Sequence, residues 1–334
     1  MKDDNIYTEI AKKLNQPNSK ILPKILKKLF TPADAKLLLM LPAEPSALVK
    51  QTGLDEKTIK QKLQEFLERG LVFPTSKGPQ LARDYTQLHD ATLSSLDKWI
   101  DNDLLDLWKE FHEVEWIPST AAGPGESFVN RIKVLPALKS IEKSPSISPK
   151  DFLPIEDVRA LIKAADAIAV VPCSCRRSMR KCDSPLNVCL QFNKSAKYHL
   201  DRDTGRKLTP DEAVAIAMQA EEKGLIHTWP VRASQQLNEI CNCCRECCVI
   251  FDGGLRYHNV EKTLEKSRFR AVVDDDLCTG CEECVERCFF DAITMSKAAR
   301  PKDTKAIIDT EKCFGCGLCV VACDFDALTM VLPE

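Results

Sequence analysis

The chain has 334 residues, of which 44% are hydrophobic and 29% charged, and its net charge is −2. This length predicts two or three domains with apolar cores, and the composition is that of a soluble globular protein. No apolar run approaches the length of a membrane-spanning helix, and the first ten residues, MKDDNIYTEI, lack the apolar core of a signal peptide. We therefore expect a cytoplasmic protein, in which 17 cysteines favour metal ligands over disulfides.

Residues 1–30 have apolar side chains at helical spacing and carry seven lysines against three acidic residues, a net charge of +4. Pro17 and Pro23 interrupt this pattern. The segment is predicted to be a helical lead to the first domain.

Residues 31–84 show a compact order of predicted elements. Thr31 and Pro32 begin one helix, Pro45 precedes a second, and Asp55 caps a third. Residues 71–73 and 80–82 are predicted to form a hairpin. This order resembles a winged helix-turn-helix, in which the third helix would enter the major groove of DNA.

The charge of this winged-helix-like segment does not favour DNA. Six basic residues and five acidic ones lie between Glu44 and Lys77, and Glu56 is near the start of the third helix. A surface that neutralises phosphates needs a larger basic excess. DNA stays an open alternative, and docking to a protein is the favoured interpretation.

Residues 85–118 are rich in large side chains, among them Trp99, Trp108 and Phe111. This pattern predicts a helical connector with a packed face, rather than a cofactor pocket. The chain contains no G-x-G-x-x-G sequence, so we expect no nucleotide cofactor.

Residues 119–266 form a predicted cysteine-rich α/β domain with a helix at 154–165, a buried strand at 168–171 and a capped helix starting at Thr209. Four basic residues, Arg176, Arg177, Arg180 and Lys181, crowd the first cysteines; they either offset cluster charge, bind an anionic ligand or form a solvated loop. Three histidines, His199, His227 and His258, are isolated, which favours polar roles over ligation. Nine cysteines are candidate ligands: Cys173, Cys175, Cys182, Cys189, Cys241, Cys243, Cys244, Cys247 and Cys248.

Three interpretations of these central cysteines remain open. One or two additional iron–sulfur clusters are favoured, because soft thiolates suit them. Structural zinc is the alternative, since Cys244 and Cys247 have ordinary zinc spacing. Inert thiols or a catalytic dithiol are the third. The sequence does not divide the ligands between sites.

Residues 267–334 contain two cysteine quartets with the same C-x2-C-x2-C-x3-C spacing. The segment Asp274–Met295 repeats at an offset of 35 residues as Asp309–Met330, with 12 of 22 positions identical, which indicates a duplicated unit. The quartets are Cys278, Cys281, Cys284, Cys288 and Cys313, Cys316, Cys319, Cys323.

These quartets resemble the bacterial two-[4Fe–4S] ferredoxin family, although Phe289 and Asp324 replace the proline that usually follows each run. The resemblance implies that the fourth cysteine of each run crosses to the other cluster. One cluster would then have Cys278, Cys281, Cys284 and Cys323 as ligands. The other would have Cys313, Cys316, Cys319 and Cys288.

A second resemblance covers the middle of the chain. A Pro-Cys-x-Cys-Arg run at 172–176, Gly-Leu-Ile-His at 224–227 and the Asn-Cys-Cys run at 242–244 are similar to ferredoxin-fused iron–sulfur proteins of anaerobes. The chain is thus expected to be an α+β multidomain protein with two [4Fe–4S] clusters and one or two more.

We expect an electron carrier or oxidoreductase component, rather than a stand-alone enzyme. Residues 268–334 carry eight basic and thirteen acidic residues, a balance of −5, so the redox partner should present a basic docking surface. Two other functions stay open: a redox-sensing winged-helix regulator, and an oxidoreductase with a catalytic central cluster.

Overall fold

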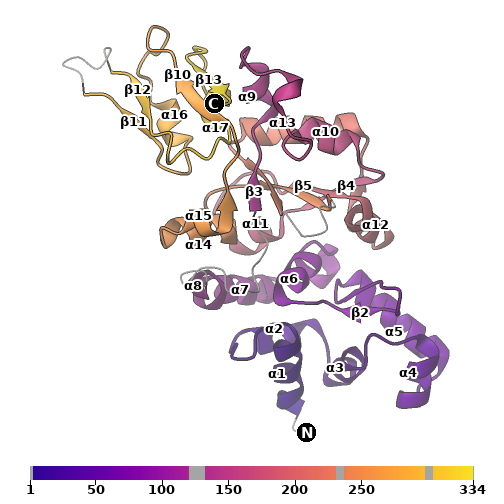
Figure 1. The fold of residues 1–334 in the computed structure, drawn as a ribbon. Helices are drawn as coiled ribbons and strands as arrows, with labels where there is room; N and C mark the ends of the chain where they lie inside the picture. Colours follow the sequence, from indigo (N-terminus) through magenta and orange to yellow (C-terminus); the bar gives the residue numbers. More distant parts are fainter. Residues whose placement is uncertain (1–2, 120–131, 231–236, 298–303, 334) are drawn as a thin grey trace. The chain divides into compact units, whose positions relative to one another are not determined.

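The fold mixes helices and sheets, and the computed structural model describes residues 3–119, 132–230, 237–297 and 304–333 (Figure 1). Packing divides the chain into two compact units. The first comprises Met1–Ser119, Pro172–Lys181 and Tyr198–Gly205, and the second comprises Thr120–Val171, Cys182–Lys197 and Arg206–Glu334. Within the described ranges, every helix is too short or too polar to traverse a lipid bilayer.

Helices of the first unit begin where the sequence provides caps. The Thr31 hydroxyl accepts a hydrogen bond from the Asp34 amide, and the Asp34 carboxylate accepts one from the Thr31 amide, which forms a capping box. The Asp55 carboxylate accepts from the Thr58 amide. The first five helices are α1 (Asp3–Lys13), α2 (Leu22–Leu29), α3 (Pro32–Leu39), α4 (Pro45–Thr52) and α5 (Glu56–Glu68).

A short antiparallel hairpin follows these helices. Strand β1 (Val72–Phe73) pairs with β2 (Gln80–Leu81). The three helices and the hairpin predicted between residues 31 and 84 are therefore present.

The connector after the hairpin is helical, and its aromatic side chains form a core. Its elements are α6 (Tyr85–Leu93), η1 (Asp97–Trp99), α7 (Asn102–Phe111), η2 (His112–Trp116) and α8 (Ile117–Ser119). Trp108, Phe111 and Trp116 are buried, and Tyr85 packs edge-on against Phe111 and Trp116. This packing matches the structural interpretation of the aromatic pattern.

Two later segments complete the first unit, namely α11 (Ser174–Met179) and the residues from Tyr198 to Gly205, which include the end of α12 (Asn193–Asp201). Arg202 is buried and donates hydrogen bonds to the Ala91 carbonyl at 2.8 Å and to the Ser95 hydroxyl at 2.7 Å. These bonds hold the returning chain against α6.

A seven-stranded sheet organises the second unit, with the strand order β6-β4-β5-β8-β7-β3-β9. Neighbouring strands are antiparallel in the pairs β3–β7, β7–β8, β5–β8 and β4–β6, and β3 is parallel to β9. The strands are β3 (Ile132–Val134), β4 (Ile168–Pro172), β5 (Asn187–Phe192), β6 (Arg206–Lys207), β7 (Ile226–Pro230), β8 (Glu239–Cys243) and β9 (Leu264–Glu265).

The helices of the second unit are mostly short. The helix predicted at 154–165 is confined to α10, because Asp157 caps it by accepting from the Arg159 and Ala160 amides. The capping box predicted at Thr209 begins α13. These helices are α9 (Leu138–Glu142), η4 (Pro149–Asp151), α10 (Val158–Lys163), α13 (Pro210–Glu222), α14 (Val249–Arg256) and α15 (Val260–Thr263).

The two cysteine quartets lie in a small substructure of two hairpin-like sheets and two single-turn helices, drawn in orange and yellow in Figure 1. Its elements are β10 (Arg270–Val273), α16 (Glu283–Glu286), β11 (Ile293–Met295), β12 (Ala306–Ile308), α17 (Leu318–Val321) and β13 (Leu328–Val331). In each repeat one helix is followed by one strand: α16 by β11 in the first repeat, and α17 by β13 in the second.

Two glycines with left-handed backbone give a test of packing in the first unit. At Gly70 (φ +79°) an added Cβ would lie 2.4 Å from the Ala91 carbonyl oxygen, whereas at Gly53 (φ +73°) it would meet open space. We expect Gly53→Ala to lower the free energy of unfolding by about 1–2 kcal/mol, from backbone strain alone. Gly70→Ala should cost at least about 2 kcal/mol more, because the backbone must move. Denaturant unfolding of the anaerobic protein checks this, and equal losses would contradict it.

Candidate metal centres

Strand pairing joins the start of each cysteine repeat to the end of the other. Strand β10 precedes the first quartet and pairs with β13, which follows the second; β11 follows the first quartet and pairs with β12, which precedes the second. The Asp274 amide donates to the Ala327 carbonyl, and the Asp309 amide donates to the Ala292 carbonyl, both at 2.8 Å. This exchange places the last cysteine of each repeat beside the other repeat.

One cavity collects thiols from both quartets. Cys278, Cys281 and Cys284 line it together with Cys323, and the other lining side chains include Val273, Met295 and Leu328. Burial, together with smaller effects of the thiols of Cys281, Cys278 and Cys323, raises the pKa of Cys284 to about 11. Four soft donors around an otherwise largely apolar cavity suit a cubane cluster.

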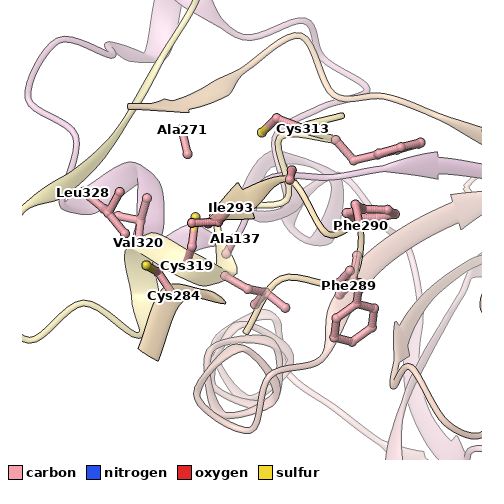
Figure 2. Packing of buried hydrophobic residues seen from close by; sticks show 14 of the residues in the cluster. Ala137, Ala271, Cys284, Phe289, Phe290, Ile293, Cys313, Cys319, Val320 and Leu328 are labelled. Carbon is pink, nitrogen blue, oxygen red and sulfur yellow. The ribbon is translucent and has the colours of Figure 1, made fainter. Parts of the chain in front are cut away.

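The second group is more deeply buried. Burial raises the pKa of Cys316 to about 12, with added effects of Cys288 and Cys313, and it raises the pKa of Cys319 well above its usual range. Cys288, from the first quartet, is therefore close to the second. Figure 2 shows Cys284, Cys313 and Cys319 among the buried apolar side chains of this region.

The backbone around this second group has little freedom. The Cys316 carbonyl accepts a hydrogen bond from the Ala137 amide at 2.9 Å, which ties the loop to the start of α9. Gly315 has a φ of +67°, and an added Cβ would lie 2.0 Å from the Phe269 carbonyl oxygen. A side chain at this position would displace the loop that carries Cys313 and Cys316.

Three cations donate to the carbonyl groups of these cysteines. Lys305 reaches Cys278 at 2.5 Å, Lys143 reaches Cys323 at 2.7 Å, and Arg245 reaches Cys288 at 3.3 Å. Positive charge at these positions offsets the charge of four thiolates and would raise the potential of a bound cluster.

Residues 277–327 match the family model of the 4Fe-4S dicluster domain. This segment of the chain is a 4Fe-4S dicluster domain. No curated protein and no solved structure shows a significant match to the chain. The dicluster domain and the many further cysteines support an iron–sulfur electron-transfer role.

Outside the dicluster domain, three central cysteines lie side by side on strands β5 and β8: Cys189, Cys241 and Cys243. Leu190 pairs with Ile240, and continuing this antiparallel register places Cys189 opposite Cys241. The Cys241 thiol is hydrogen-bonded to the thiols of Cys189 and Cys243. Since side chains alternate along a strand, Cys241 and Cys243 are on one face of the sheet.

Cys248, at the N-cap of α14, extends this row. Hydrogen bonds with Cys241 and Cys248 lower the pKa of Cys243 to about 6, while the pKa of Cys241 is raised well above its usual range. The hydroxyl oxygen of Thr228, on β7, lies 3.5 Å from the Cys243 sulfur. We call Cys189, Cys241, Cys243 and Cys248 the strand row.

A second central group is separate from the strand row. Cys182, from the loop before β5, lies 3.6 Å from Cys244 and 3.7 Å from Cys247, measured between sulfur atoms. Cys244 and Cys247 are in the turn between β8 and α14, and both are buried. We call these three residues the thiol triad. The sequence identified its members but could not separate them from the strand row.

The remaining two predicted central ligands belong to the first unit. Cys173 is the N-cap of α11 and Cys175 lies within it. The basic residues beside them have partners in that unit: Arg177 bonds to the Leu93 and Ser95 carbonyls, Arg180 pairs with Asp106, and Lys181 pairs with Glu113. These contacts favour a structural role for the three side chains.

The face of the sheet opposite the strand row carries a buried polar network that the sequence did not reveal. His227 on β7 contacts the Asn242 side-chain oxygen with Nδ1 and the Glu221 carboxylate with Nε2, the latter at 2.8 Å. The Asn242 amide group donates to the Val188 carbonyl. The Glu221 carboxylate also accepts from the Leu138 amide at 2.6 Å. The network therefore fixes Asn242 between two cysteines of the strand row.

Replacing His227 tests this network. The side chains of Glu221, His227 and Asn242 are at most 1% exposed, so His227→Asn should leave buried polar atoms without partners. We expect a loss of about 3–5 kcal/mol in the free energy of unfolding, measured by denaturation of the anaerobic protein.

His258→Asn is the matched control. His258 is exposed and has a φ of +50°, a conformation that asparagine tolerates. A change within about 0.5 kcal/mol is expected for this variant. Similar losses in both variants would show that the network contributes nothing special.

Proposed function

We propose that this protein is a multi-cluster electron carrier that exchanges single electrons with a partner oxidoreductase. The observation that best supports this proposal is that one cavity is lined by Cys278, Cys281, Cys284 and Cys323, which is distant in sequence. In this proposal these residues hold one [4Fe–4S] cluster, and Cys288 joins Cys313, Cys316 and Cys319 around the other. A bound cluster of this kind supplies a one-electron redox centre.

Exposure of the ligands suggests where electrons enter or leave. Cys281 is exposed, whereas Cys313 and Cys319 are buried. Close approach of redox centres favours transfer, so the Cys281 side is the proposed contact for the partner. The surrounding protein holds the ligands and sets the local charge.

The surface near Cys281 combines acidic side chains with two exposed apolar ones. Leu277 and Phe325 are about half exposed, at 49% and 50%. Eight exposed acidic residues precede or follow the cysteines of this cavity in sequence: Asp274, Asp275, Asp276, Glu282, Glu283, Glu286, Asp324 and Asp326. This composition suits a partner with a basic, partly apolar docking surface.

The strand row is the proposed site of an additional iron–sulfur cluster. Its Cys248 is buried in the same apolar cluster as Cys284, Cys313 and Cys319, and Cys243 packs against that cluster. Phe251 of α14 packs edge-on against Phe289, with ring centroids 5.5 Å apart. A redox centre on the strand row would therefore be continuous with the core of the dicluster domain.

The helices and hairpin at 31–84 are proposed to bind a partner protein. They would act as a winged-helix-like segment that contacts protein rather than DNA. Lysines on α5 are offset by acids of the same unit: Lys60 pairs with Glu56, and Lys62 pairs with Asp34 at 3.0 Å. Paired lysines leave little charge for phosphates. DNA binding is thus the less favoured alternative.

Crossed ligation gives a direct prediction about two equivalent cysteines. Cys323→Ala should damage the cluster of Cys278, Cys281 and Cys284, and Cys288→Ala should damage the other cluster, because each removes a fourth ligand. EPR and Mössbauer spectra of anaerobic protein, with the two clusters resolved by their potentials, provide the measurement. Damage confined to the cluster of the mutated repeat would reject the crossed assignment.

Electron exchange at the acidic surface can be tested with model acceptors. The dithionite-reduced protein should reduce cytochrome c, which is basic, faster than flavodoxin, which is acidic, and the rate should fall as salt is added. Glu282→Gln with Glu283→Gln should slow cytochrome c reduction by roughly two- to tenfold at low salt, through slower association.

The control for this pair is Glu9→Gln with Glu44→Gln, which makes the same change in net charge at two exposed residues of the first unit. The control should leave the rate unchanged. Reduction that is insensitive to salt and to both pairs would reject docking at Cys281. No electron transfer from fully loaded clusters would reject the carrier function.

A further inference from the structure

The sulfur atoms of the thiol triad are unusually close together. Cys182 is 3.6 Å from Cys244 and 3.7 Å from Cys247, and all three sulfurs lie within 4.8 Å of one another. The triad unites residues 62 and 65 positions apart in the sequence. Three thiols held this close together in a largely buried region are positioned to bind one metal ion.

These spacings fit one tetrahedral metal ion. Zinc binds thiolate sulfur at about 2.3 Å, and two corners of a tetrahedron of that radius are about 3.8 Å apart. The distances from the Cys182 sulfur to the sulfurs of Cys244 and Cys247, 3.6 and 3.7 Å, nearly equal this edge. A fourth donor is needed to complete the tetrahedron, and the triad itself supplies three corners.

The dicluster thiols provide an internal comparison. Within the described residues, no three of them come within 4.8 Å of one another, although all eight are described. Four of them instead stand around a cavity. Cysteines are thus grouped in two ways in this chain. Four dicluster thiols surround a cavity that suits a cubane cluster, whereas the three triad sulfurs are close enough together to bind a single ion.

The local sequence agrees with the geometry. Cys244 and Cys247 have the C-x2-C spacing of structural zinc sites, in a turn between a strand and a helix. They are 3% and 1% exposed. Neighbouring Cys243 and Cys248 belong to the strand row, so the two inner cysteines of this run join the triad and the two outer ones join the row.

We propose that Cys182, Cys244 and Cys247 are ligands of a single structural zinc ion, separate from every iron–sulfur site. Bound zinc would fasten the loop before β5 to the turn after β8 and close a loop of more than sixty residues. The ion has no redox chemistry, so its role is to position the turn that carries Cys243 and Cys248. The proposal does not depend on electron transfer by the dicluster domain.

The test uses full-length protein purified without oxygen, with zinc and iron measured in the same samples. Wild type should contain about one zinc per chain, and zinc-edge X-ray absorption should show at least three sulfurs at about 2.3 Å. Cys182→Ser and Cys244→Ser should each reduce zinc to near zero and keep the iron signals of the dicluster domain. Cys281→Ser, the matched control, should disturb a dicluster signal and retain zinc.

A variant that fails to fold would lose both metals. Wild type, Cys281→Ser and Cys244→Ser are therefore also treated with a zinc chelator and then with Co²⁺. Tetrahedral cobalt–thiolate absorption bands, present in Cys281→Ser and lost in Cys244→Ser, would support the site. The proposal is overturned if wild type contains no zinc, if iron takes its place, or if zinc persists in both triad variants. Loss of electron transfer with zinc retained would instead count against the carrier function alone.

Discussion

Exchange of strands between the two cysteine repeats is the constraint on which the dicluster domain depends. Because β10 pairs with β13 and β11 with β12, the beginning of one repeat is hydrogen-bonded to the end of the other. This pairing brings Cys323 to the cavity of Cys278, Cys281 and Cys284. The exposed Cys281, Glu282 and Glu283 also line this cavity, and Lys305 and Lys143 donate to carbonyl groups of its cysteines.

Much of this domain could be predicted because its signals are local. The spacing within each quartet and the 35-residue repeat are visible in the sequence. Caps such as Thr31 and Thr209 likewise marked helix starts that the structure contains. The helix expected at 154–165 was too long, since Asp157 begins α10 only after a turn. A helical pattern does not reveal which of several polar residues will act as the cap.

The central cysteines show where such prediction ends. Their grouping depends on the register between β5 and β8 and on a loop more than sixty residues from the turn it meets. Neighbours in sequence, Cys243 and Cys244, join different groups, so spacing alone is misleading. The partners of His227 were invisible for the same reason, because Glu221 and Asn242 reach it from a helix and another strand.

Strand exchange also limits how the dicluster domain could be divided. A polypeptide with only one repeat would have an unpaired strand at each side, and its first three cysteines would lack the thiol that the other repeat brings to them. It could recover both the hydrogen bonds and the fourth thiol by associating with a second copy of itself. A single-repeat fragment should therefore be a homodimer, and covalent duplication makes that association intramolecular and independent of protein concentration.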